Sequence, residues 1–333
     1  MVKKVIALTG GAGYIGSHLA LSLLDHGYEP LIIDNFVNSD KKTIKKLESI
    51  SNKKILNYAI DINECDKLTN IFKNTKIEAV IHLAALKSIP ESLNKPLVYF
   101  NNNVNGLINT LIAMKRGACN KIIFSSSCSV YSRKAIVPVT ENSSIEGNNP
   151  YSKSKIICEE ILDQTSKADP LLEYVSLRYF NPIGAHSSGI IGDNLESKNT
   201  NLMSEVCKVA NNQKSYLTVF GGDYETVDGT CIRDYIHIND LVEGHISALN
   251  NLSNLHAIPS INLGTGKGYT VLELIKTFEK VNNIKIPFKL EKRRNGDLEK
   301  IYADATLAKK LLKWKAEHNL DTMCSSSWNY VKI

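Results

Sequence analysis

The stretch Lys4-Val5-Ile6-Ala7-Leu8-Thr9-Gly10-Gly11-Ala12-Gly13-Tyr14-Ile15-Gly16 decides the fold of this chain. Its apolar start predicts a short strand over residues 4–9, and its glycines fit both G-x-G-x-x-G from Gly11 and the looser G-x-x-G-x-x-G from Gly10. Leucines at helical spacing follow over residues 19–24. A glycine turn between a strand and a helix lets the backbone approach a pyrophosphate, with the helix N-terminus facing the anion. The stretch therefore predicts a dinucleotide-binding turn.

A second strand supports this interpretation. The run Pro30-Leu31-Ile32-Ile33 ends in Asp34, which lies 18 residues past Gly16. At this distance an acidic residue binds the ribose hydroxyls of NAD and disfavours the extra phosphate of NADP. A glycine motif alone also occurs in ordinary strand-to-helix turns, but strand, helix and carboxylate together favour NAD binding.

The next part of the chain alternates β-branched apolar runs with helical patterns, which indicates a parallel sheet covered on both faces. We expect strands over 54–60, 79–84, 121–125 and 173–178, and helices that include 68–73, 104–114 and 153–162. In such sheets ligands bind at the carboxyl ends of the strands. Five strand ends are polar or small and should meet at one crevice, namely Thr9-Gly10, Asp34-Asn35, Asp61, Ala84-Ala85 and Ser125-Ser126-Ser127.

The regular alternation weakens after Asn181 into a loop-rich stretch, and mixed strands and helices follow from about residue 219, with a further strand over 260–263. We therefore expect an α/β fold, a Rossmann-type doubly wound parallel sheet with a smaller mixed α/β C-terminal lobe for substrate. The expected division is 1–180 for the NAD-binding domain and 181–333 for the second lobe, with segments around 233–250 packing back on the first domain.

Composition excludes several classes of protein. The chain has 333 residues, is 43% hydrophobic and carries a formal net charge of +6, from lysines spread along the sequence. Without a basic block interleaved with aromatic residues, we expect no nucleic-acid binding. The seven cysteines form no C-x-x-C pair, and the histidines form no H-E-x-x-H motif, so we expect reduced thiols and no metal site. No apolar run suits a signal peptide or a membrane span, which predicts a cytoplasmic protein.

Tyr151 and Lys155 are four residues apart in a predicted helix, so their side chains share one face. A phenol titrates near ~10 and is a poor base at neutral pH unless a neighbouring ammonium stabilises its phenolate. The pair is therefore a candidate acid/base. Tyrosine and lysine at this spacing are also common on solvated helices, and only the NAD-binding pattern upstream favours the catalytic interpretation.

Two more groups of residues belong near the expected crevice. Ser127 ends the Phe124-Ser125-Ser126-Ser127 strand, and its hydroxyl is suited to donate to a substrate oxygen while sharing the proton of Tyr151. Arg233 and the Arg293-Arg294 pair supply guanidinium groups, which suit phosphate oxygens. From the residues alone, Arg293 and Arg294 fit solvated loop charges equally well.

These motifs resemble the extended short-chain dehydrogenase/reductases and, over nearly the whole chain, the UDP-glucose (UDP-galactose) 4-epimerase family within them. The glycine turn and Tyr151-Ser152-Lys153-Ser154-Lys155 carry the wider resemblance. The narrower one is carried by segments in the family's order: Ile33-Asp34-Asn35, His82–Lys87, Asn102–Gly106, Phe124–Ser127, Leu177–Pro182, Gly184-Ala185-His186, Asn201-Leu202-Met203, Asp228-Gly229-Thr230, Arg233–His237 and Arg293–Asp297.

The resemblance implies an isomerase that keeps NAD bound and interconverts UDP-glucose and UDP-galactose through a transient 4-keto sugar. Tyr151 would take the proton of the sugar O4, Lys155 would hold the nicotinamide ribose and stabilise the phenolate, and Ser127 would bind the reacting oxygen. By match to the family, the cofactor-binding residues are Gly10, Gly13, Tyr14, Ile15, Gly16, Asp34, Asn35, Asp61, Ile62, Ala84, Lys87, Asn102, Tyr151, Lys155 and Phe180. The matched substrate-binding residues are Lys87, Ser127, Asn181, Asn201, Leu202, Thr218, Phe220, Arg233, Arg294, Asp297 and Ile301.

The chain departs from the family in two places. Cys128-Ser129 and Ser132 stand where members usually show Ala-Thr and Gly, which could shift a turn near the active site. Ile301 stands where the family walls the sugar pocket with a bulky residue that excludes N-acetyl groups or a small one that admits them. Isoleucine is intermediate in size, so the resemblance leaves open whether UDP-N-acetylglucosamine and UDP-N-acetylgalactosamine are also substrates.

Three alternatives share the fold. Nucleotide-sugar 4,6-dehydratases have the Tyr/Lys pair, but in that group Asp-Glu follows the strand-end serine or threonine, where this chain has Cys128 and Ser129. A non-catalytic NAD-binding regulator would usually lose the Tyr/Lys pair. A net oxidoreductase would need added cofactor for turnover, whereas an epimerase works with the NAD it already holds. The resemblance further implies a homodimer built from a four-helix contact between nucleotide-binding domains.

Overall fold

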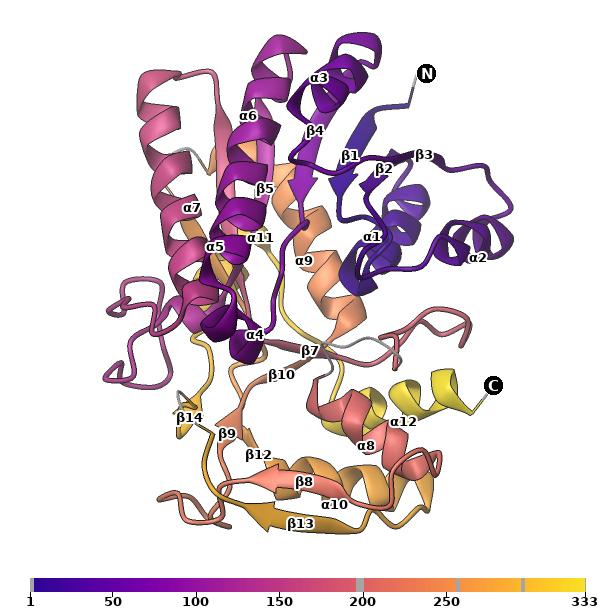
Figure 1. Ribbon diagram of the computed structural model, residues 1–333, viewed down its shortest axis with the longest axis vertical. Coiled ribbons are helices and arrows are strands. Elements are labelled where there is room, and N and C mark those ends of the chain that lie inside the picture. Colours follow the sequence, from indigo (N-terminus) through magenta and orange to yellow (C-terminus); the bar gives the residue numbers. More distant parts are fainter. Residues whose placement is uncertain (1–2, 196–200, 256–257, 295–296, 333) are drawn as a thin grey trace.

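The glycine turn joins a buried strand to a buried helix in the computed structural model, which describes residues 3–195, 201–255, 258–294 and 297–332. The strand is β1 (Val5–Thr9) and the helix is α1 (Tyr14–Asp25). β1 lies inside a seven-stranded sheet of order β11-β6-β5-β4-β1-β2-β3, in which every pairing is parallel. The predicted Rossmann-type α/β fold is therefore confirmed (Figure 1).

The other strands of this sheet lie close to their expected positions. They are β2 (Glu29–Asp34), β3 (Leu56–Ala59), β4 (Ile77–His82), β5 (Lys121–Ser127), β6 (Glu173–Tyr179) and β11 (Ser260–Leu263). β11 pairs with β6 at the edge of the sheet, so this strand belongs to the first layer and not to the later lobe in which we expected it. Its four residues are all buried, and an apolar strand of this kind completes the sheet where β6 would otherwise be an open edge.

Successive residues of β1 face opposite sides of the sheet and enter two different cores. Ile6 and Leu8 pack into a cluster with Leu19 of α1, whereas Ala7 packs into a second cluster with Phe72 and Leu107. Both faces are thus covered by helices, as a parallel sheet requires. The helices are α2 (Lys42–Ser51), α3 (Cys65–Asn74), α4 (Ile89–Asn94), α5 (Pro96–Phe100), α6 (Gly106–Arg116), α7 (Pro150–Ala168), α9 (Ile238–Asn251) and α11 (Thr306–Leu312).

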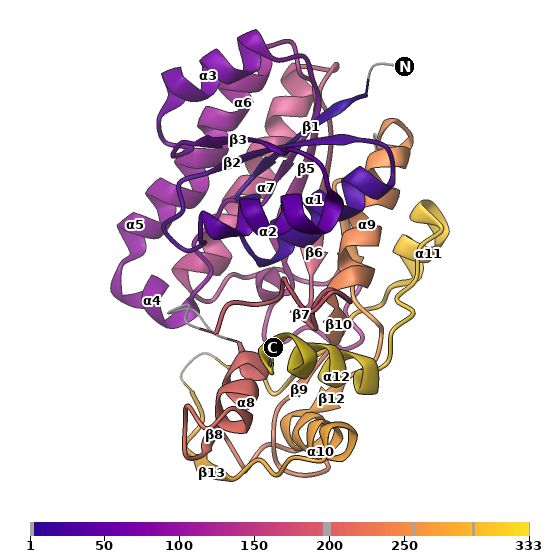
Figure 2. The ribbon, with the colours of Figure 1, turned by 90° about the vertical axis from the view of Figure 1, so that its right-hand side faces the viewer.

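The remaining elements form a smaller layer below the carboxyl ends of the main strands (Figures 1 and 2). Its helices α8 (Leu202–Ala210), α10 (Val271–Asn282) and α12 (Leu320–Val331) share a third apolar cluster with strand β8. Its short sheets are β7–β10, β12–β9–β14 and β8–β13, with bounds β7 (Asn181–Ile183), β8 (Leu217–Phe220), β9 (Ile232–Arg233), β10 (Tyr235–His237), β12 (Tyr269–Thr270), β13 (Phe288–Glu291) and β14 (Lys300–Ile301).

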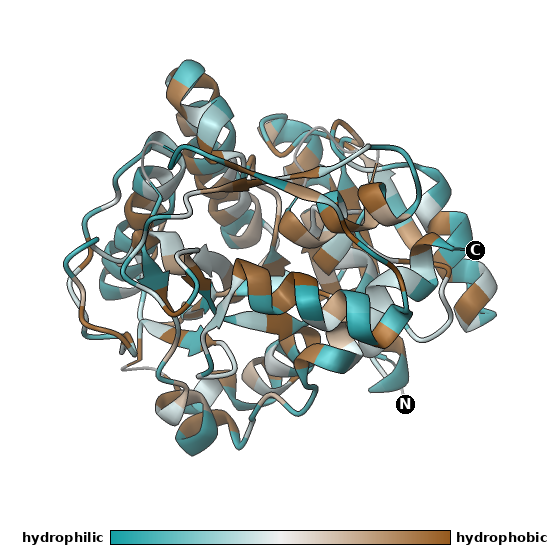
Figure 3. Cartoon of the chain, turned by 90° about the horizontal axis from the view of Figure 1, so that it is seen from below, coloured by the Kyte–Doolittle hydropathy of each residue, from teal (hydrophilic) through white to brown (hydrophobic). Residues whose placement is uncertain are grey.

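Local irregularities occur beside the expected crevice. A π-helical turn, η1 (Asn101–Asn105), precedes α6, and a 3₁₀ turn, η2 (Cys128–Val130), follows β5. A second 3₁₀ turn, η3 (Leu252–Asn254), follows α9 at the other edge of the sheet, where Ser253 donates a hydrogen bond to Glu173 at the start of β6. Hydrophobic and hydrophilic residues occupy different sides of the helices in the view from below (Figure 3). The carboxyl ends of the main strands face the smaller layer (Figure 1), and the ligand site is expected at these ends.

Candidate active site

The glycine turn leaves the N-terminus of α1 free of any side-chain cap. Gly13 is the N-cap residue, and no side chain accepts a hydrogen bond from the first turn. Amides at such a position are suited to an anion. A Cβ atom at Gly16 would lie 2.6 Å from the carbonyl oxygen of Gly10, and one at Gly10, where φ is +70°, would lie 2.8 Å from the amide nitrogen of Ala84. The tight turn therefore requires glycine at both positions.

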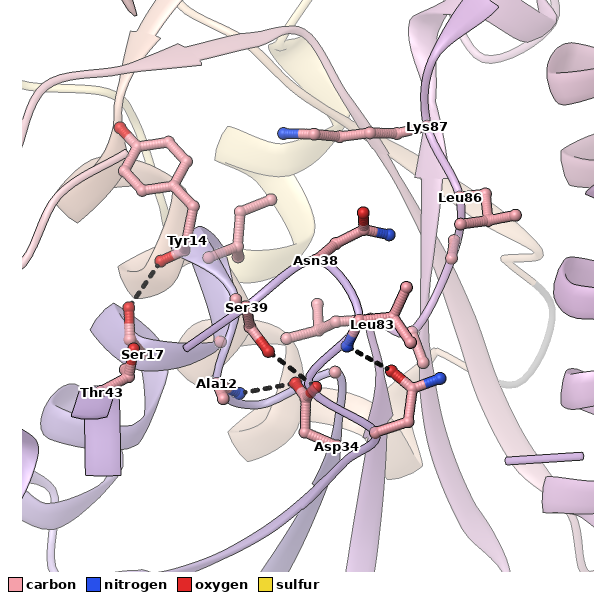
Figure 4. A pocket seen from close by; sticks show the side chains of 18 of the residues that line it. Ala12, Tyr14, Ser17, Asp34, Asn38, Ser39, Thr43, Leu83, Leu86 and Lys87 are labelled. Carbon is pink, nitrogen blue, oxygen red and sulfur yellow. Dashed lines mark hydrogen bonds between the residues drawn. The ribbon is translucent and has the colours of Figure 1, made fainter. Parts of the chain in front are cut away.

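Asp34 ends β2 beside this turn with its carboxylate already oriented. Its Oδ2 accepts a hydrogen bond from the Ala12 amide at 3.0 Å, and its Oδ1 accepts from the Phe36 amide and the Ser39 hydroxyl, both at 2.8 Å (Figure 4). The side chain is 8% exposed and lines the cavity described below. These donors fix a negative charge where a ribose diol would need an acceptor.

A cavity of about 570 Å³ opens at the carboxyl ends of the strands (Figure 4). All five strand ends that we expected to meet contribute to its wall. Of the expected cofactor-binding residues, those that line it are Gly10, Gly13, Tyr14, Ile15, Gly16, Asp34, Asn35, Asp61, Ile62, Ala84, Lys87 and Asn102. Figure 4 shows Lys87 in its upper part and Asp34 in its lower part, and both line the cavity.

Hydrogen bonds to the Asp61 carboxylate hold part of the cavity wall in place. The Asn35 side-chain amide donates to Asp61 Oδ2 at 2.8 Å, and the Asn63 amide donates to Asp61 Oδ1 at 2.8 Å. Burial raises the pKa of Asp61, but these hydrogen bonds lower it further, so the net pKa is below the usual value. Asp61 is therefore ionised at neutral pH.

Several residues of this wall carry no recognisable motif in the sequence. The segment after β2 supplies Val37, Asn38, Ser39, Asp40, Thr43 and Lys46, and the later part of the chain supplies Ile191, Gly192, Asp193, Asn194 and Tyr330. The first group follows Asp34 closely in the sequence, and this closeness to the expected ribose-binding residue is the signal that could have predicted it. The second group reaches the cavity only through tertiary folding.

Tyr151 and Lys155 lie in the first two turns of α7, which begins at Pro150 after an Asn149 cap. Lys155 is 2% exposed, and its Nζ donates a hydrogen bond of 2.6 Å to the carbonyl oxygen of Ser125. The same Nζ lies 6.0 Å from the centroid of the Tyr151 ring and 4.8 Å from that of Phe124. The helix therefore brings phenol and ammonium to one side of the strand end, as the spacing predicts.

The pKa of the phenol differs from the expectation. Burial raises the pKa of Tyr151 to about 12, and the opposing effect of a hydrogen bond with Ser127 is smaller. Burial also lowers the pKa of Lys155 to about 8. The expected stabilisation of the phenolate by Lys155 alone is thus not found, because desolvation disfavours the charged form of both groups.

Ser127 lies at the end of β5, where its Oγ accepts a hydrogen bond of 3.2 Å from the Ser129 amide. Ser125 of the same strand end lines the cavity, so this end of β5 forms part of its wall. Tyr151, Lys155 and Phe180 themselves do not line this cavity. Phe180 is 3% exposed and packs in a small cluster with Val130, Ile156 and Ile301.

The expected diphosphate-binding arginines lie in the smaller layer and differ in their surroundings. Arg233 Nη2 pairs with Asp297 Oδ1 at 3.0 Å, with side chains 13% and 29% exposed. The Arg294 guanidinium lies 3.9 Å from the centroid of the Phe220 ring. Arg293 instead pairs with Asp223 at 2.8 Å and stacks on Tyr224, with 44% of its side chain exposed. The other two residues of that motif, Asn295 and Gly296, lie outside the described residues.

The remaining expected substrate residues also lie in this layer. Thr218 and Phe220 belong to β8, Asn201 caps α8 and Leu202 is the first residue of that helix. The Asn201 side-chain amide donates to Asp193 Oδ2 at 2.8 Å. Asn181 begins β7, and its side-chain oxygen is buried without a hydrogen-bond partner in the described part of the structure.

Ile301 belongs to β14, and only 3% of its surface is exposed. It packs in the small cluster with Val130 and Tyr131, and the partly buried Cys128 packs against the same cluster. Cys128 follows Ser127 directly, so Ile301 lies close to the carboxyl end of β5.

Within the described ranges, no three His, Cys, Asp or Glu side chains gather as they would around a metal ion. None of the helices among those residues combines the length and hydropathy that a bilayer-spanning segment needs.

Comparison with known proteins fits this geometry. The family model described as GDP-mannose 4,6 dehydratase matches residues 8–327. A UDP-glucose 4-epimerase of Arabidopsis thaliana is 44% identical over 333 residues, which covers 99% of this chain and 95% of the relative. The chain belongs to the UDP-glucose 4-epimerase family. Within the broader group that the dehydratase model describes, the relatives thus favour the epimerases.

Solved structures of the UDP-glucose 4-epimerase family have the same fold. The epimerase of Bifidobacterium longum in complex with NAD⁺ and UDP has a TM-score of 0.94 and 40% identity, over 99% of this chain and 98% of its own. The epimerase of Stenotrophomonas maltophila with bound NAD and formylated UDP-arabinopyranose has a TM-score of 0.94 and 38% identity, with the same coverage.

Proposed function

We propose that this member of the epimerase family interconverts UDP-glucose and UDP-galactose with a tightly held NAD. The observation that supports this most directly is the cavity that joins the uncapped glycine turn and Asp34 to Lys87 and Ser125, next to the Tyr151–Lys155 pair. In the solved Bifidobacterium longum relative, NAD⁺ and UDP are bound together.

The residues present fit NAD. Glycines at positions 10 and 16 allow the backbone approach that a pyrophosphate needs, and Asp34 offers acceptors for a ribose diol. Its negative charge disfavours the additional phosphate of NADP. Held by the glycine turn and Asp34, NAD would supply a hydride acceptor and donor for the sugar C4.

In the proposed reaction Tyr151 removes the proton of the sugar O4 and later returns it. Lys155, held by the Ser125 carbonyl, supplies a positive charge near the phenol, and Ser127 binds the reacting oxygen. The 4-keto sugar must turn over before the hydride returns, so it cannot be gripped firmly. Binding energy has to come from the part of the substrate that does not react, which is UDP.

We assign the UDP group to the smaller layer. The residues proposed to hold it are Asn181, Asn201, Leu202, Thr218, Phe220, Arg233, Arg294 and Asp297. Stacking on Phe220 fixes the plane of the Arg294 guanidinium, a group suited to phosphate oxygens, and Asp297 orients Arg233. We accordingly assign most of the NAD site to residues 1–180, with part of its wall from residues 191–194 and Tyr330, and most of the UDP site to residues 181–333.

We further propose a homodimer in the cytoplasm. Helices α4 to α6 expose an apolar face, on which Leu97 is 81%, Leu93 50% and Ile108 37% exposed. Another copy of this chain would cover it with the same helices, consistent with a two-fold contact. All seven cysteines are free, which suits a reducing compartment. Sedimentation of Leu97→Glu, compared with the unchanged protein, tests the dimer: a dimeric variant would contradict this surface.

The function is tested by mixing the purified protein with UDP-galactose without added NAD and measuring UDP-glucose. We expect conversion to equilibrium with no net NADH formed. Conversion that depends on added NAD would indicate a net oxidoreductase, and a 4-keto-6-deoxy product would indicate a dehydratase. Absence of any product, in protein shown to contain NAD, would support a non-catalytic regulator.

A further inference from the structure

One face of α7 carries three functional groups in succession. Tyr151, Lys155 and Glu159 are spaced four residues apart, so their side chains lie in a row along the helix. The row faces the last residues of β5, which end in Ser125, Ser126 and Ser127. Each of the three helix residues interacts with a different serine of this strand end.

Glu159 makes the contact furthest from the phenol. The Ser126 hydroxyl donates a hydrogen bond of 2.5 Å to Glu159 Oε1. Lys155 makes the neighbouring contact with the Ser125 carbonyl at 2.6 Å. The strand end is thus fastened to α7 by two side chains one helical turn apart. Ser127, the next residue, is held where it interacts with Tyr151.

Arg178 of β6 fixes the carboxylate of Glu159 from the other side. Its Nε donates to Oε1 at 3.0 Å and its Nη2 to Oε2 at 2.7 Å, a two-bond fork. Its Nη1 donates to the Tyr131 hydroxyl at 3.2 Å and to the Glu141 carbonyl at 3.0 Å. The side chains of Arg178 and Glu159 are only 6% and 13% exposed. A buried pair of this kind is rigid, because neither charge can be left without its partner.

We propose that the Glu159–Arg178 pair is a positioning device for the proton transfer, which holds the end of β5 against α7 and so sets Ser127 opposite Tyr151. Neither residue lines the cavity, and neither is expected to touch the sugar or the cofactor. The pair acts through Ser126 and through the backbone of the strand end. The inference rests on the proposed epimerase function, because it concerns the residues proposed to move the proton.

The pair also affects the charge of Lys155. The groups that face Lys155 are Tyr151, Cys158 and Glu159 on its own helix and the neutral His82 of β4, whose pKa burial lowers to about 3. The negative charge of Glu159 therefore favours the ammonium. Loss of that negative charge would remove a favourable interaction with the ammonium and so favour the neutral amine.

The test compares Glu159→Gln with the matched control Glu173→Gln. Glu173 lies at the opposite end of β6, where it also accepts from a serine, Ser253, at 2.6 Å and lies 4.0 Å from a cation, Lys121. In Glu159→Gln the new amide keeps the shape of the side chain but offers one acceptor oxygen in place of two. Turnover of UDP-galactose is measured from pH 6 to 10 in both variants.

We expect Glu159→Gln to lower kcat at least ~10-fold, with KM changed less than ~3-fold because neither Glu159 nor Arg178 is among the residues proposed to bind UDP. We also expect its alkaline limb to move to lower pH, while Glu173→Gln keeps the profile of the unchanged protein. The double variant Glu159→Gln/Arg178→Met removes both charges, so no unpaired buried charge remains to destabilise the fold. It should remain slow, and recovery of kcat in it would overturn the proposal.

The proposal would also be overturned if Glu159→Gln showed the same kcat and the same pH profile as the control variant Glu173→Gln. If the unchanged protein shows no epimerase turnover, the proposed function fails by itself. The positioning role is then decided by the crystal structure of Glu159→Gln, in which Ser127 should move relative to the Tyr151 hydroxyl. An unmoved Ser127 would contradict it.

Discussion

The ammonium of Lys155 lies 6.0 Å from the centre of the Tyr151 ring and is bonded at 2.6 Å to the Ser125 carbonyl, not to the phenol. The strand end therefore fixes the position of the cation, and the phenol lies within its field. Burial raises the pKa of Tyr151 to about 12 in this arrangement. Desolvation of the phenol thus outweighs the opposing hydrogen bond with Ser127.

Replacing Tyr151 by phenylalanine removes only the hydroxyl. We expect kcat to fall by at least ~10²-fold, the low end for a positioned acid or base. The apolar wall and the Lys155 contact should persist, so NAD content and thermal unfolding should match those of the unchanged protein. Turnover of UDP-galactose with equal NAD content is the measurement, and near-normal turnover would mean that another group carries the proton.

Replacing Lys155 by methionine should separate stability from catalysis. Burial lowers the pKa of Lys155 to about 8 from about 10.4 in the unfolded chain, so the buried ammonium opposes folding below pH 8. This opposition disappears as the pH rises from about 8 to 10. Lys155→Met should therefore unfold with a free energy higher by up to ~3 kcal/mol at pH 7 and no higher at pH 10.

Lys155→Met should reduce activity at pH 7, although it raises the free energy of unfolding at that pH. Loss of the ammonium should lower kcat at pH 7, and the unchanged protein should lose activity as the pH rises through about 8. Urea unfolding and turnover at both pH values provide the data. An equal stability difference at pH 7 and pH 10 would show that Lys155 is not a buried cation in the folded protein.

The two adjacent arginines should differ in their effect on substrate binding. Arg294 stacks on Phe220, whereas Arg293 is 44% exposed and paired with Asp223. A charge-assisted hydrogen bond contributes about 1.5–3 kcal/mol, so Arg294→Met should raise KM for UDP-galactose by ~10-fold or more with kcat nearly unchanged. Arg293→Met is the matched control and should change KM less than ~3-fold, because an exposed ion pair contributes little. Equal effects of the two variants would contradict the assignment.

Ile301 is expected to limit the size of the sugar. It is buried beside the cluster that includes Phe180 and Tyr131, so Ile301→Ala should cost about 2–5 kcal/mol of unfolding free energy and leave space. We expect the rate with UDP-N-acetylglucosamine to rise relative to that with UDP-glucose. Ile301→Leu, which keeps the volume, is the control. Negligible rates with the acetylated sugar in both the variant and the unchanged protein would rule out this role.

Local patterns in the sequence predict the parts of the site that lie at strand ends. The glycine turn, Asp34 and the Tyr151–Lys155 spacing each follow from one strand or one helix, and the parallel order then brings them to one edge. The two-residue strands β9, β12 and β14 are too short for any periodic pattern. The placement of β11 beside β6 also depends on tertiary packing, because a short buried strand fits either layer.

Residues far along the chain complete the wall, and no spacing rule connects them with the glycine turn. Asp193 and Tyr330 line the same cavity as Gly13, although they lie 180 and more residues away. The raised pKa of Tyr151 was likewise missed, because the sequence shows the neighbouring cation but not the depth of burial.

The position of Tyr330 in the final helix α12 has a consequence for how the dinucleotide is kept. The strand-and-helix half provides the turn and the carboxylate, but the last helix closes part of the wall around them. A chain that stopped before Leu320 would retain those recognition elements and yet leave the compartment open to solvent. We therefore expect a chain truncated before Leu320 to release NAD faster than one that retains α12, because its compartment wall would lack Tyr330.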